Sequence, residues 1–173
     1  MSVVGAGTMG NGIAQVFAQT GWHVTLIDVQ AQQLEKALQT IGKNLDRLIT
    51  KGILPADAKE KTLGNLTTST SIQEGVKDSS IVIEAATENQ SIKLAIFKQI
   101  DQFAAAECIL ATNTSSIPIQ IIAKATSRPD KVIGMHFMNP VPIMKLVEII
   151  KGSETSNIVA DTIVTMSKEL GKV

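Results

Sequence analysis

The chain has few aromatic residues and no net charge. Among its 173 residues there is no tyrosine, Trp22 is the one tryptophan, and 16 basic residues balance 16 acidic ones. A surface that stacks on bases needs aromatic side chains, and one that binds nucleic acid or acidic lipid needs excess positive charge. We therefore expect neither nucleic acid nor a membrane as a partner.

The sequence also has no long apolar run and only one cysteine. No run approaches the roughly 20 residues that a membrane-spanning helix needs. The first residues, MSVVGAG, lead directly into an expected strand and leave no room for a targeting peptide. Cys108, in ECILAT, cannot form an intrachain disulfide, and we expect a buried strand residue rather than a catalytic thiol. These features indicate a reducing, cytoplasmic location.

Short apolar segments alternate with helical patterns along the chain. This alternation predicts an α/β fold of the Rossmann type, with a doubly wound, mostly parallel sheet. A loop containing two prolines separates the last two strands, so these are expected to form an added C-terminal strand hairpin. The expected strands lie in SVV, HVTLID, NLTTST, SIVIEAA, CILATN, KVIGMHF and KLVEII, and expected helices include 10–20 and 156–170.

A helical hairpin is expected between the second and third strands, at about 31–64. The connection is too long for a simple crossover. Its first part carries apolar residues at helical spacing, and PADAKEKTL starts a second helix. The residues that define the apolar face are Leu34, Leu38, Ile41, Leu45 and Leu48.

Both ends of the sequence are short of a complete pattern. The first strand keeps about three residues before its glycine loop, and the last helix stops at GKV, where a strand or linker is expected to begin. We interpret residues 1–173 as a single NAD-binding domain of a longer chain.

The segment GAGTMG contains a dinucleotide-binding pattern, with Gly5, Gly7 and Gly10 between an expected strand and helix. Asp28 ends the next strand, where its carboxylate can accept hydrogen bonds from the adenosine ribose. An acid there repels a 2′-phosphate, so the pattern favours NAD over NADP, and Gln30 agrees with this choice. The alternative is an ordinary strand–turn–helix in which Asp28 caps the following helix.

A histidine and a glutamate lie on the two strands of the expected hairpin. His136 and Glu148 can approach each other if MNPVPIM folds the chain back. A buried glutamate needs a partner, and the carboxylate would orient the imidazole and raise its basicity. The free ring nitrogen could then take the proton of an alcohol during hydride transfer. The alternative is a purely structural hydrogen bond.

Four segments, in this order and spacing, carry a family resemblance: GAGTMGNGIA, IEAATEN, NTSS and HFMNPVPIMKLVEI. Together they resemble the L-3-hydroxyacyl-CoA dehydrogenases, and among these the bacterial 3-hydroxybutyryl-CoA dehydrogenases. The resemblance covers the whole chain. It implies that His136 is the general base, that Glu148 orients it, and that Ser115 hydrogen-bonds the 3-oxygen of the substrate.

The resemblance also implies contacts with NAD and coenzyme A, and no metal. The implied NAD contacts are Gly5, Gly7, Thr8, Met9, Gly10, Asp28, Glu88, Lys93, Asn113, Ser115 and Asn139. The implied coenzyme A contacts are Asn44, Lys51 and Ser115. Lys51 belongs to a basic stripe with Lys43 and Arg47 that could meet the phosphates of coenzyme A. Glu84, in SIVIEAA, is not assigned to the site.

Each assignment has a structural alternative. Ser115 or Ser116 could cap a helix, Asn139 could be a turn residue, Glu88 and Lys93 could be solvated charges, and the basic stripe could be a solvated helix face. Two other functions stay open: a related dehydrogenase of a free hydroxy acid or sugar acid, and a nucleotide-binding protein without turnover. Relatives of this kind carry a helical C-terminal domain that closes the substrate cleft and forms a homodimer. The isolated chain is therefore expected to be inactive.

Overall fold

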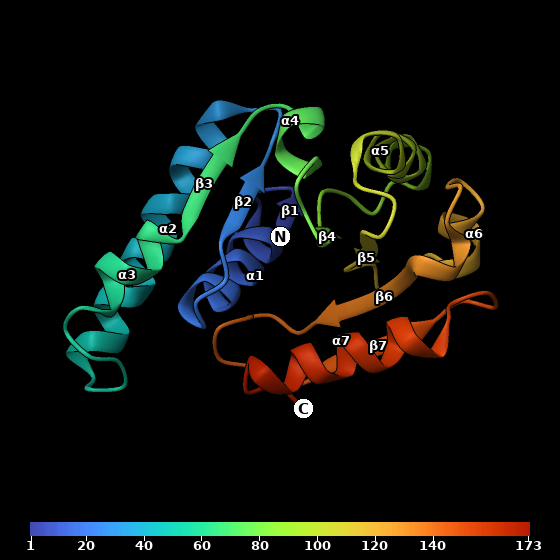
Figure 1. The fold of residues 1–173 in the computed structure, drawn as a ribbon. Helices are drawn as coiled ribbons and strands as arrows, with labels where there is room; N and C mark the ends of the chain where they lie inside the picture. Colours follow the sequence, from blue (N-terminus) through green and yellow to red (C-terminus); the bar gives the residue numbers. More distant parts are fainter.

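Seven strands form one mixed sheet in the computed structural model, which describes residues 1–173 (Figure 1). Their order is β3-β2-β1-β4-β5-β6-β7, and only the β6–β7 pair is antiparallel. This topology confirms the predicted doubly wound fold and the C-terminal strand hairpin. The strands are β1 (Ser2–Val4), β2 (Val24–Ile27), β3 (Leu66–Ser69), β4 (Ile81–Glu84), β5 (Ile109–Thr112), β6 (Val132–Phe137) and β7 (Val147–Lys151).

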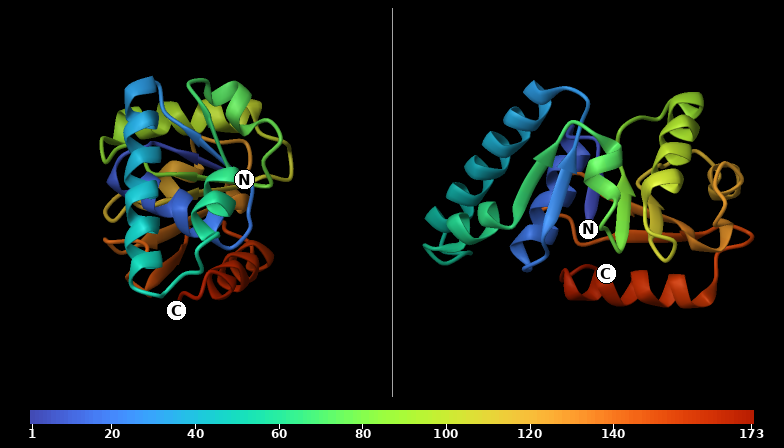
Figure 2. Two further views of the ribbon diagram at one scale, coloured as in Figure 1. Left: turned by 90° about the vertical axis from the view of Figure 1, so that its left-hand side faces the viewer. Right: turned by 45° about the horizontal axis from the view of Figure 1, so that its top comes forward.

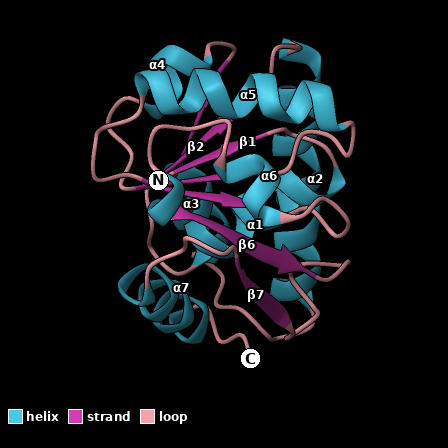
Figure 3. Ribbon diagram, turned by 90° about the vertical axis from the view of Figure 1, so that its right-hand side faces the viewer, coloured by secondary structure: helices cyan, strands magenta, loops and turns pink.

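Helices cover both faces of the sheet. Figure 3 shows α4 and α5 on one side of the strands and α7 on the other. None of the helices is both long and apolar enough to cross a bilayer. The helices are α1 (Thr8–Gln19), α2 (Ala31–Thr50), α3 (Ala58–Gly64), α4 (Ile72–Val76), α5 (Gln90–Phe103), α6 (Ile119–Ala123) and α7 (Asn157–Glu169), with a 3-10 turn η1 (Pro129–Lys131).

The sheet has an apolar core on each face. Successive strand residues point to opposite faces, so a sheet covered on both sides needs apolar residues at neighbouring positions. Val3 and Ile83 pack with α1, α2 and α7, whereas the adjacent Val4 and Val82 pack with α4, α5 and α6. The continuous apolar runs of the sequence arise from this double coverage.

The helical hairpin between β2 and β3 is present where it was expected. Helices α2 and α3 span 31–64 apart from their connecting turn, and they project beside the sheet edge (Figure 2). Leu34 and Ala37 of α2 belong to the same core as Ile13 and Phe17 of α1. The apolar face of α2 thereby fixes the hairpin against the helix that begins at the glycine loop.

The start of α1 differs from its prediction, whereas the predicted burial of Cys108 is confirmed. Helix α1 begins at Thr8 rather than Gly10, because the N–H of Asn11 already donates to the carbonyl of Gly7 over 2.9 Å. Cys108 is 1% exposed, as expected, and burial raises the pKa of its thiol to about 11. A thiol with that pKa is almost entirely protonated at neutral pH, so Cys108 is a poor nucleophile.

Candidate active site

The loops that carry the predicted site meet at one edge of the sheet. The strand registers pair Val4 with Glu84, Glu84 with Thr112, and Thr112 with Gly134. The carboxyl ends of β1, β4 and β5 are therefore level, next to the second half of β6. Open α/β sheets bind ligands at this edge, where the direction of winding reverses.

The glycine loop is shaped by close backbone approaches. Gly5 has φ +100°, and a Cβ at this position would lie 2.6 Å from the Cα of Ala86. A Cβ on Gly10 would lie 1.7 Å from the carbonyl oxygen of Gly5, so only glycine fits at this position in the first turn of α1. Above Gly7, in contrast, the space is open. The loop thus presents free backbone at the N-terminus of a helix, which suits the pyrophosphate of NAD.

Asp28 links the glycine loop to the second strand. Its carboxylate accepts the N–H of Ala6 and the N–H of Gln30, both over 2.9 Å. The N-cap position of α2 is Gln30, whose side chain makes no capping hydrogen bond. The interpretation of Asp28 as the helix cap is therefore wrong. Asp28 lines a cleft of about 380 Å³ with Val29 and Ile92, where both carboxylate oxygens keep lone pairs for ribose hydroxyls.

The segment NTSS forms the loop after β5, and Glu88 holds it. The Glu88 carboxylate accepts the hydroxyl of Thr114 over 2.6 Å, the hydroxyl of Ser116 over 3.3 Å and the N–H of Ser115 over 3.3 Å. The hydroxyl of Ser115 is left free at the surface. Helix α6 has no side-chain cap, so neither Ser115 nor Ser116 is a helix-capping residue.

Asn113 connects this loop to the strand that carries the histidine. Its side-chain oxygen accepts the N–H of Phe137 over 2.9 Å, in a buried position. The bond joins the end of β5 to the end of β6. Ser115 and His136 are therefore held at the same end of adjacent strands.

The predicted histidine–glutamate pair is formed. His136 on β6 and Glu148 on β7 are direct partners in the antiparallel register, and the Nδ1 of the imidazole lies 2.8 Å from Oε2 of the carboxylate. A carboxylate that accepts from Nδ1–H fixes the tautomer in which Nε2 has a free lone pair. The pair can therefore accept a proton at Nε2.

The expectation that Glu148 is buried is wrong. Its side chain is 51% exposed and that of His136 is 21% exposed. The cause is the position of β7 at the edge of the sheet, where Val147 faces the core and Glu148 faces outward. Glu148 thus pairs with His136 at the surface, without the desolvation cost of a buried carboxylate.

Lys93 and Glu84 form a buried ion pair below the site. They are 1% and 0% exposed, and the ammonium of Lys93 also lies 3.5 Å from the hydroxyl of Thr112. Glu84 accepts the N–H of Ala86 over 2.8 Å and that of Thr87 over 3.4 Å, so it fixes the turn that packs on Gly5. Lys93 is not a solvated charge. The sequence offered no sign of this role for Glu84, since a lone acid in an apolar strand does not reveal its partner.

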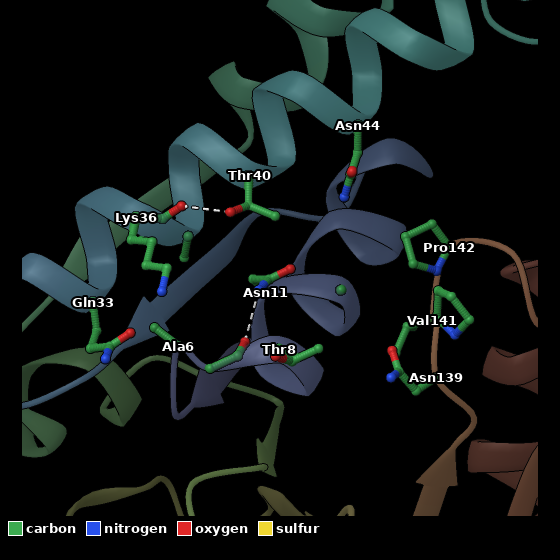
Figure 4. A pocket seen from close by; sticks show the side chains of 14 residues that line it. Ala6, Thr8, Asn11, Gln33, Lys36, Thr40, Asn44, Asn139, Val141 and Pro142 are labelled. Carbon is green, nitrogen blue, oxygen red and sulfur yellow. Dashed lines mark hydrogen bonds between the residues drawn. The ribbon is translucent and has the colours of Figure 1, made fainter.

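A cleft of about 420 Å³ lies between α2, α1 and the loop from β6 to β7 (Figure 4). Asn44 and Thr40 border it from α2, Thr8 and Asn11 from α1, and Asn139 from the β6–β7 loop (Figure 4). The side-chain N–H of Asn44 also donates to Gln15 over 3.2 Å. The implied coenzyme A contact Asn44 and the implied NAD contact Asn139 therefore line one cleft.

Lysines of α2 line two different clefts. Lys43 lines another cleft, on the side of α2 that faces α3. Lys36, which the sequence analysis did not select, lines the cleft of Figure 4 together with Thr40 and Asn44. Helical spacing continues this face to Arg47 and Lys51. The sequence does contain this face, as polar residues at helical spacing: Lys36, Thr40, Asn44, Arg47 and Lys51.

Comparisons with known proteins show the family of the chain. Residues 1–173 match the family model described as 3-hydroxyacyl-CoA dehydrogenase, NAD binding domain. The 3-hydroxybutyryl-CoA dehydrogenase of Clostridioides difficile is 45% identical over 173 residues, which are 100% of this chain and 61% of that protein. Human mitochondrial hydroxyacyl-coenzyme A dehydrogenase is 44% identical over 177 residues, with 99% of this chain and 56% of that protein covered.

A solved structure shares the fold of the chain. The (S)-3-hydroxybutyryl-CoA dehydrogenase of Ralstonia eutropha matches with a TM-score of 0.96 and 47% identity, over 99% of this chain and 60% of that chain. The chain thus spans less than two thirds of the length of each of these proteins.

Proposed function

The chain belongs to the family of 3-hydroxyacyl-CoA dehydrogenase NAD-binding domains, and from this premise we propose that it is the NAD-binding part of an enzyme that interconverts L-3-hydroxyacyl-CoA and 3-ketoacyl-CoA. The 3-hydroxybutyryl-CoA dehydrogenases among its relatives support a short acyl chain. The observation that carries the proposal is the His136–Glu148 pair, 2.8 Å apart at the ligand-binding edge of the sheet.

His136 acts as the general base in the proposed reaction. Its Nε2 takes the proton of the 3-hydroxyl while the C3–H bond breaks and the C3=O bond forms. NAD, when bound, accepts the hydride. Glu148 holds Nδ1–H and stabilises the imidazolium that results. In the reverse direction His136 returns the proton to the oxygen, and the free hydroxyl of Ser115 can hydrogen-bond that oxygen in both directions.

The residues around the glycine loop fit NAD. The proposed contacts run from Asp28 and the adenosine ribose, past Gly7 and the N-terminus of α1 at the pyrophosphate, to Asn139 at the nicotinamide end. The open space above Gly7 and the free lone pairs of Asp28 support this direction. Glu88 and Asn113 would act mainly by fixing the NTSS loop, since their carboxylate and amide oxygens already bind it to its neighbours.

Coenzyme A is proposed to lie along α2, in the cleft of Figure 4. Lys36 is the one charged residue that lines this cleft, and Arg47 and Lys51 follow it on the same helix face. Cations on this face suit the phosphates of coenzyme A. Asn44 would hydrogen-bond the amide-containing arm of the cofactor.

The relatives are longer than this chain, and we propose that a C-terminal domain completes the cleft and forms a homodimer in the cytoplasm. The loop between β6 and β7 supports a covering element, because it exposes large apolar side chains next to the catalytic pair. Ile143 is 72% exposed, Met144 41% and Leu146 47%. Apolar residues grouped in this way usually mark an interaction surface.

The deciding experiment measures NADH oxidation by the full-length protein with acetoacetyl-CoA and with free acetoacetate. We expect rapid oxidation with the CoA ester alone, and its loss in His136→Ala. Equal rates with the free acid would instead favour a dehydrogenase of free hydroxy acids. No oxidation of NADH with either compound would contradict the enzymatic proposal, provided that the protein is folded.

A further inference from the structure

Lys172 is a buried lysine that takes no part in the reaction described above. It follows α7, is 8% exposed and forms no ion pair. Its ammonium donates to two backbone carbonyls, that of Val141 over 2.6 Å and that of Met144 over 2.7 Å. Burial lowers its pKa, with no carboxylate to offset the effect. A lysine buried in this way is uncommon, because lysines are rarely buried without a partner of opposite charge.

Both carbonyls belong to the loop 138–146, which joins the strands of the catalytic pair. Most of the large side chains of this loop face solvent, and Val141 is the exception, at 2% exposed. Val141 packs directly on α1: a Cβ added to Gly12 would lie 2.8 Å from its Cβ. The position of the loop relative to α1 therefore depends on the packing of Val141 against Gly12 and on the hydrogen bonds from Lys172.

The turn at the end of α7 places Lys172 next to the loop 138–146. Gly171, at φ +71°, follows the end of α7, and the N–H of Lys172 donates back to the carbonyl of Ser167 over 3.0 Å. This is a helix end that reverses the chain direction. The next residue, Val173, forms two backbone hydrogen bonds beside the start of β7. Its N–H donates to the carbonyl of Lys145, and its carbonyl accepts from the N–H of Val147. The reversal places the Lys172 side chain under the loop.

We propose that Lys172 is a positioning residue: its ammonium clamps the loop 138–146 onto α1 and so sets the spacing between the glycine loop and the His136–Glu148 pair. The inference rests on the proposed function for its catalytic consequence. Asn139 lies in the clamped loop and borders the cleft together with Gly7 and Thr8 (Figure 4). The clamp therefore acts on the nicotinamide end of the cofactor site and leaves the adenosine end, at Asp28, untouched.

The test compares NADH with ADP-ribose, which lacks the nicotinamide. In the 173-residue chain, Lys172→Met keeps the length of the side chain but removes its charge and donors. We expect its affinity for ADP-ribose to stay within about twofold of the wild-type value. Its affinity for NADH should fall about tenfold, the equivalent of one hydrogen bond at the nicotinamide end. Lys168→Met, at an exposed position in the last turn of α7, is the matched control and should change neither affinity.

Gly12→Ala tests the same contact from α1 while Lys172 stays in place. The added methyl group displaces Val141, so the same selective loss of NADH affinity is expected. Both variants are measured well below their melting temperatures. If both bind the two ligands like the wild type, or if both ligands weaken equally, the inference is overturned.

Catalysis provides a second readout in the full-length protein. A displacement of about 1 Å at the reacting groups can cost roughly 100-fold in rate. Lys172→Met should therefore lower kcat by up to this factor while the KM for the CoA ester changes by less than about threefold. An unchanged kcat in the folded variant would contradict the clamp. If the wild-type protein does not turn over acetoacetyl-CoA, the proposed function fails, but the comparison of the two ligands still decides the role of Lys172.

Discussion

The His136–Glu148 pair is a hydrogen bond at the surface with a defined donor and acceptor. His136 and Glu148 pair across two strands, and the carboxylate accepts from Nδ1 over 2.8 Å. A glutamine at 148 could instead donate its amide N–H to Nδ1, which would leave the proton on Nε2 and remove the base. In the proposed mechanism, Glu148 therefore fixes the tautomer of the histidine.

We predict that Glu148→Gln lowers kcat by roughly 10²–10⁴-fold, the usual contribution of a general base. Because the Glu148 side chain is 51% exposed, the free energy of unfolding should change by no more than about 0.5 kcal/mol. Steady-state kinetics and urea unfolding of the full-length protein measure the two quantities. Glu154→Gln, also at the surface, is the control. A kcat near that of the wild type would show that Glu148 does not orient the base.

Glu84 and Lys93 show the opposite situation, a charge pair removed from water. Each is almost completely buried, and Glu84 also holds the turn after β4. Removal of one member leaves the other charge buried without compensation. We therefore predict that Lys93→Met destabilises the chain by about 3–5 kcal/mol.

The double variant Glu84→Gln/Lys93→Met should recover most of that loss, since no charge stays buried and glutamine can still accept from Ala86. Urea unfolding of the single and double variants measures the difference, with the exposed Lys98→Met in α5 as the control. A double variant no more stable than Lys93→Met would show that the charge pair is not the cause.

At the scale of the elements, apolar pattern and turn chemistry predicted most of the structure. The strands, the 31–64 hairpin and the antiparallel return of β7 were all expected, because each has a run or a period that few other structures produce. The faces of the elements were predicted less well. Lys36, which lines the cleft of Figure 4, was not selected, and Glu148 was expected to be buried. Both differences concern the neighbours of an element, which sequence spacing does not specify.

The same limit applies to the partners of charged residues. Lys93 and Lys172 look alike in the sequence, yet one pairs with Glu84 and the other with two carbonyls. Both partners are brought in by the tertiary fold. The turn of the glycine loop, which a motif defines by itself, could be predicted.

Arg128 and Asp101 join the end of α5 to the segment before β6. Arg128 donates to the Asp101 carboxylate over 2.7 Å and to the Asp101 carbonyl over 2.9 Å, and the N–H of Ser127 donates to the same carboxylate over 2.7 Å. Burial by itself would raise the pKa of Asp101. The hydrogen bonds from Ser127 and Arg128 outweigh it and hold the pKa below the ordinary value of 3.8.

Since the folded chain holds this carboxylate in its charged form, the unfolded chain binds more protons below about pH 4. The stabilisation is complete above the unfolded pKa of Asp101 and is lost as the pH falls through its folded pKa. We predict that Asp101→Asn lowers stability at pH 7 and flattens its decline between about pH 5 and pH 2. Urea unfolding at several pH values measures this, with Asp161→Asn on α7 as the control. An equally steep decline in Asp101→Asn would contradict the assignment.

At the scale of the whole molecule, the sheet separates the glycine loop from the His136–Glu148 pair. The glycine loop and Asp28 follow β1 and β2, on one side of the winding reversal, and the His136–Glu148 pair lies on β6 and β7, on the other. The NTSS loop and the β6–β7 loop connect the two halves. Cofactor binding therefore needs mainly what the 173 residues contain, whereas the His136–Glu148 pair lies partly open to water beside the edge of the sheet.

We predict from this separation that the 173-residue chain binds NADH but hardly reduces acetoacetyl-CoA. NADH at 100 times its Kd should stabilise the chain by about 2.7 kcal/mol and raise Tm by about 5–10 °C. Turnover needs a site from which water is excluded, because electrostatic stabilisation is weak in water. With the side chains of His136 and Glu148 21% and 51% exposed, the chain alone lacks that exclusion. Thermal melts and NADH oxidation on the same sample measure both, with Asp28→Ala as the control for binding. Turnover near the rate of the full-length protein would show that the strands of this chain already form a complete active site.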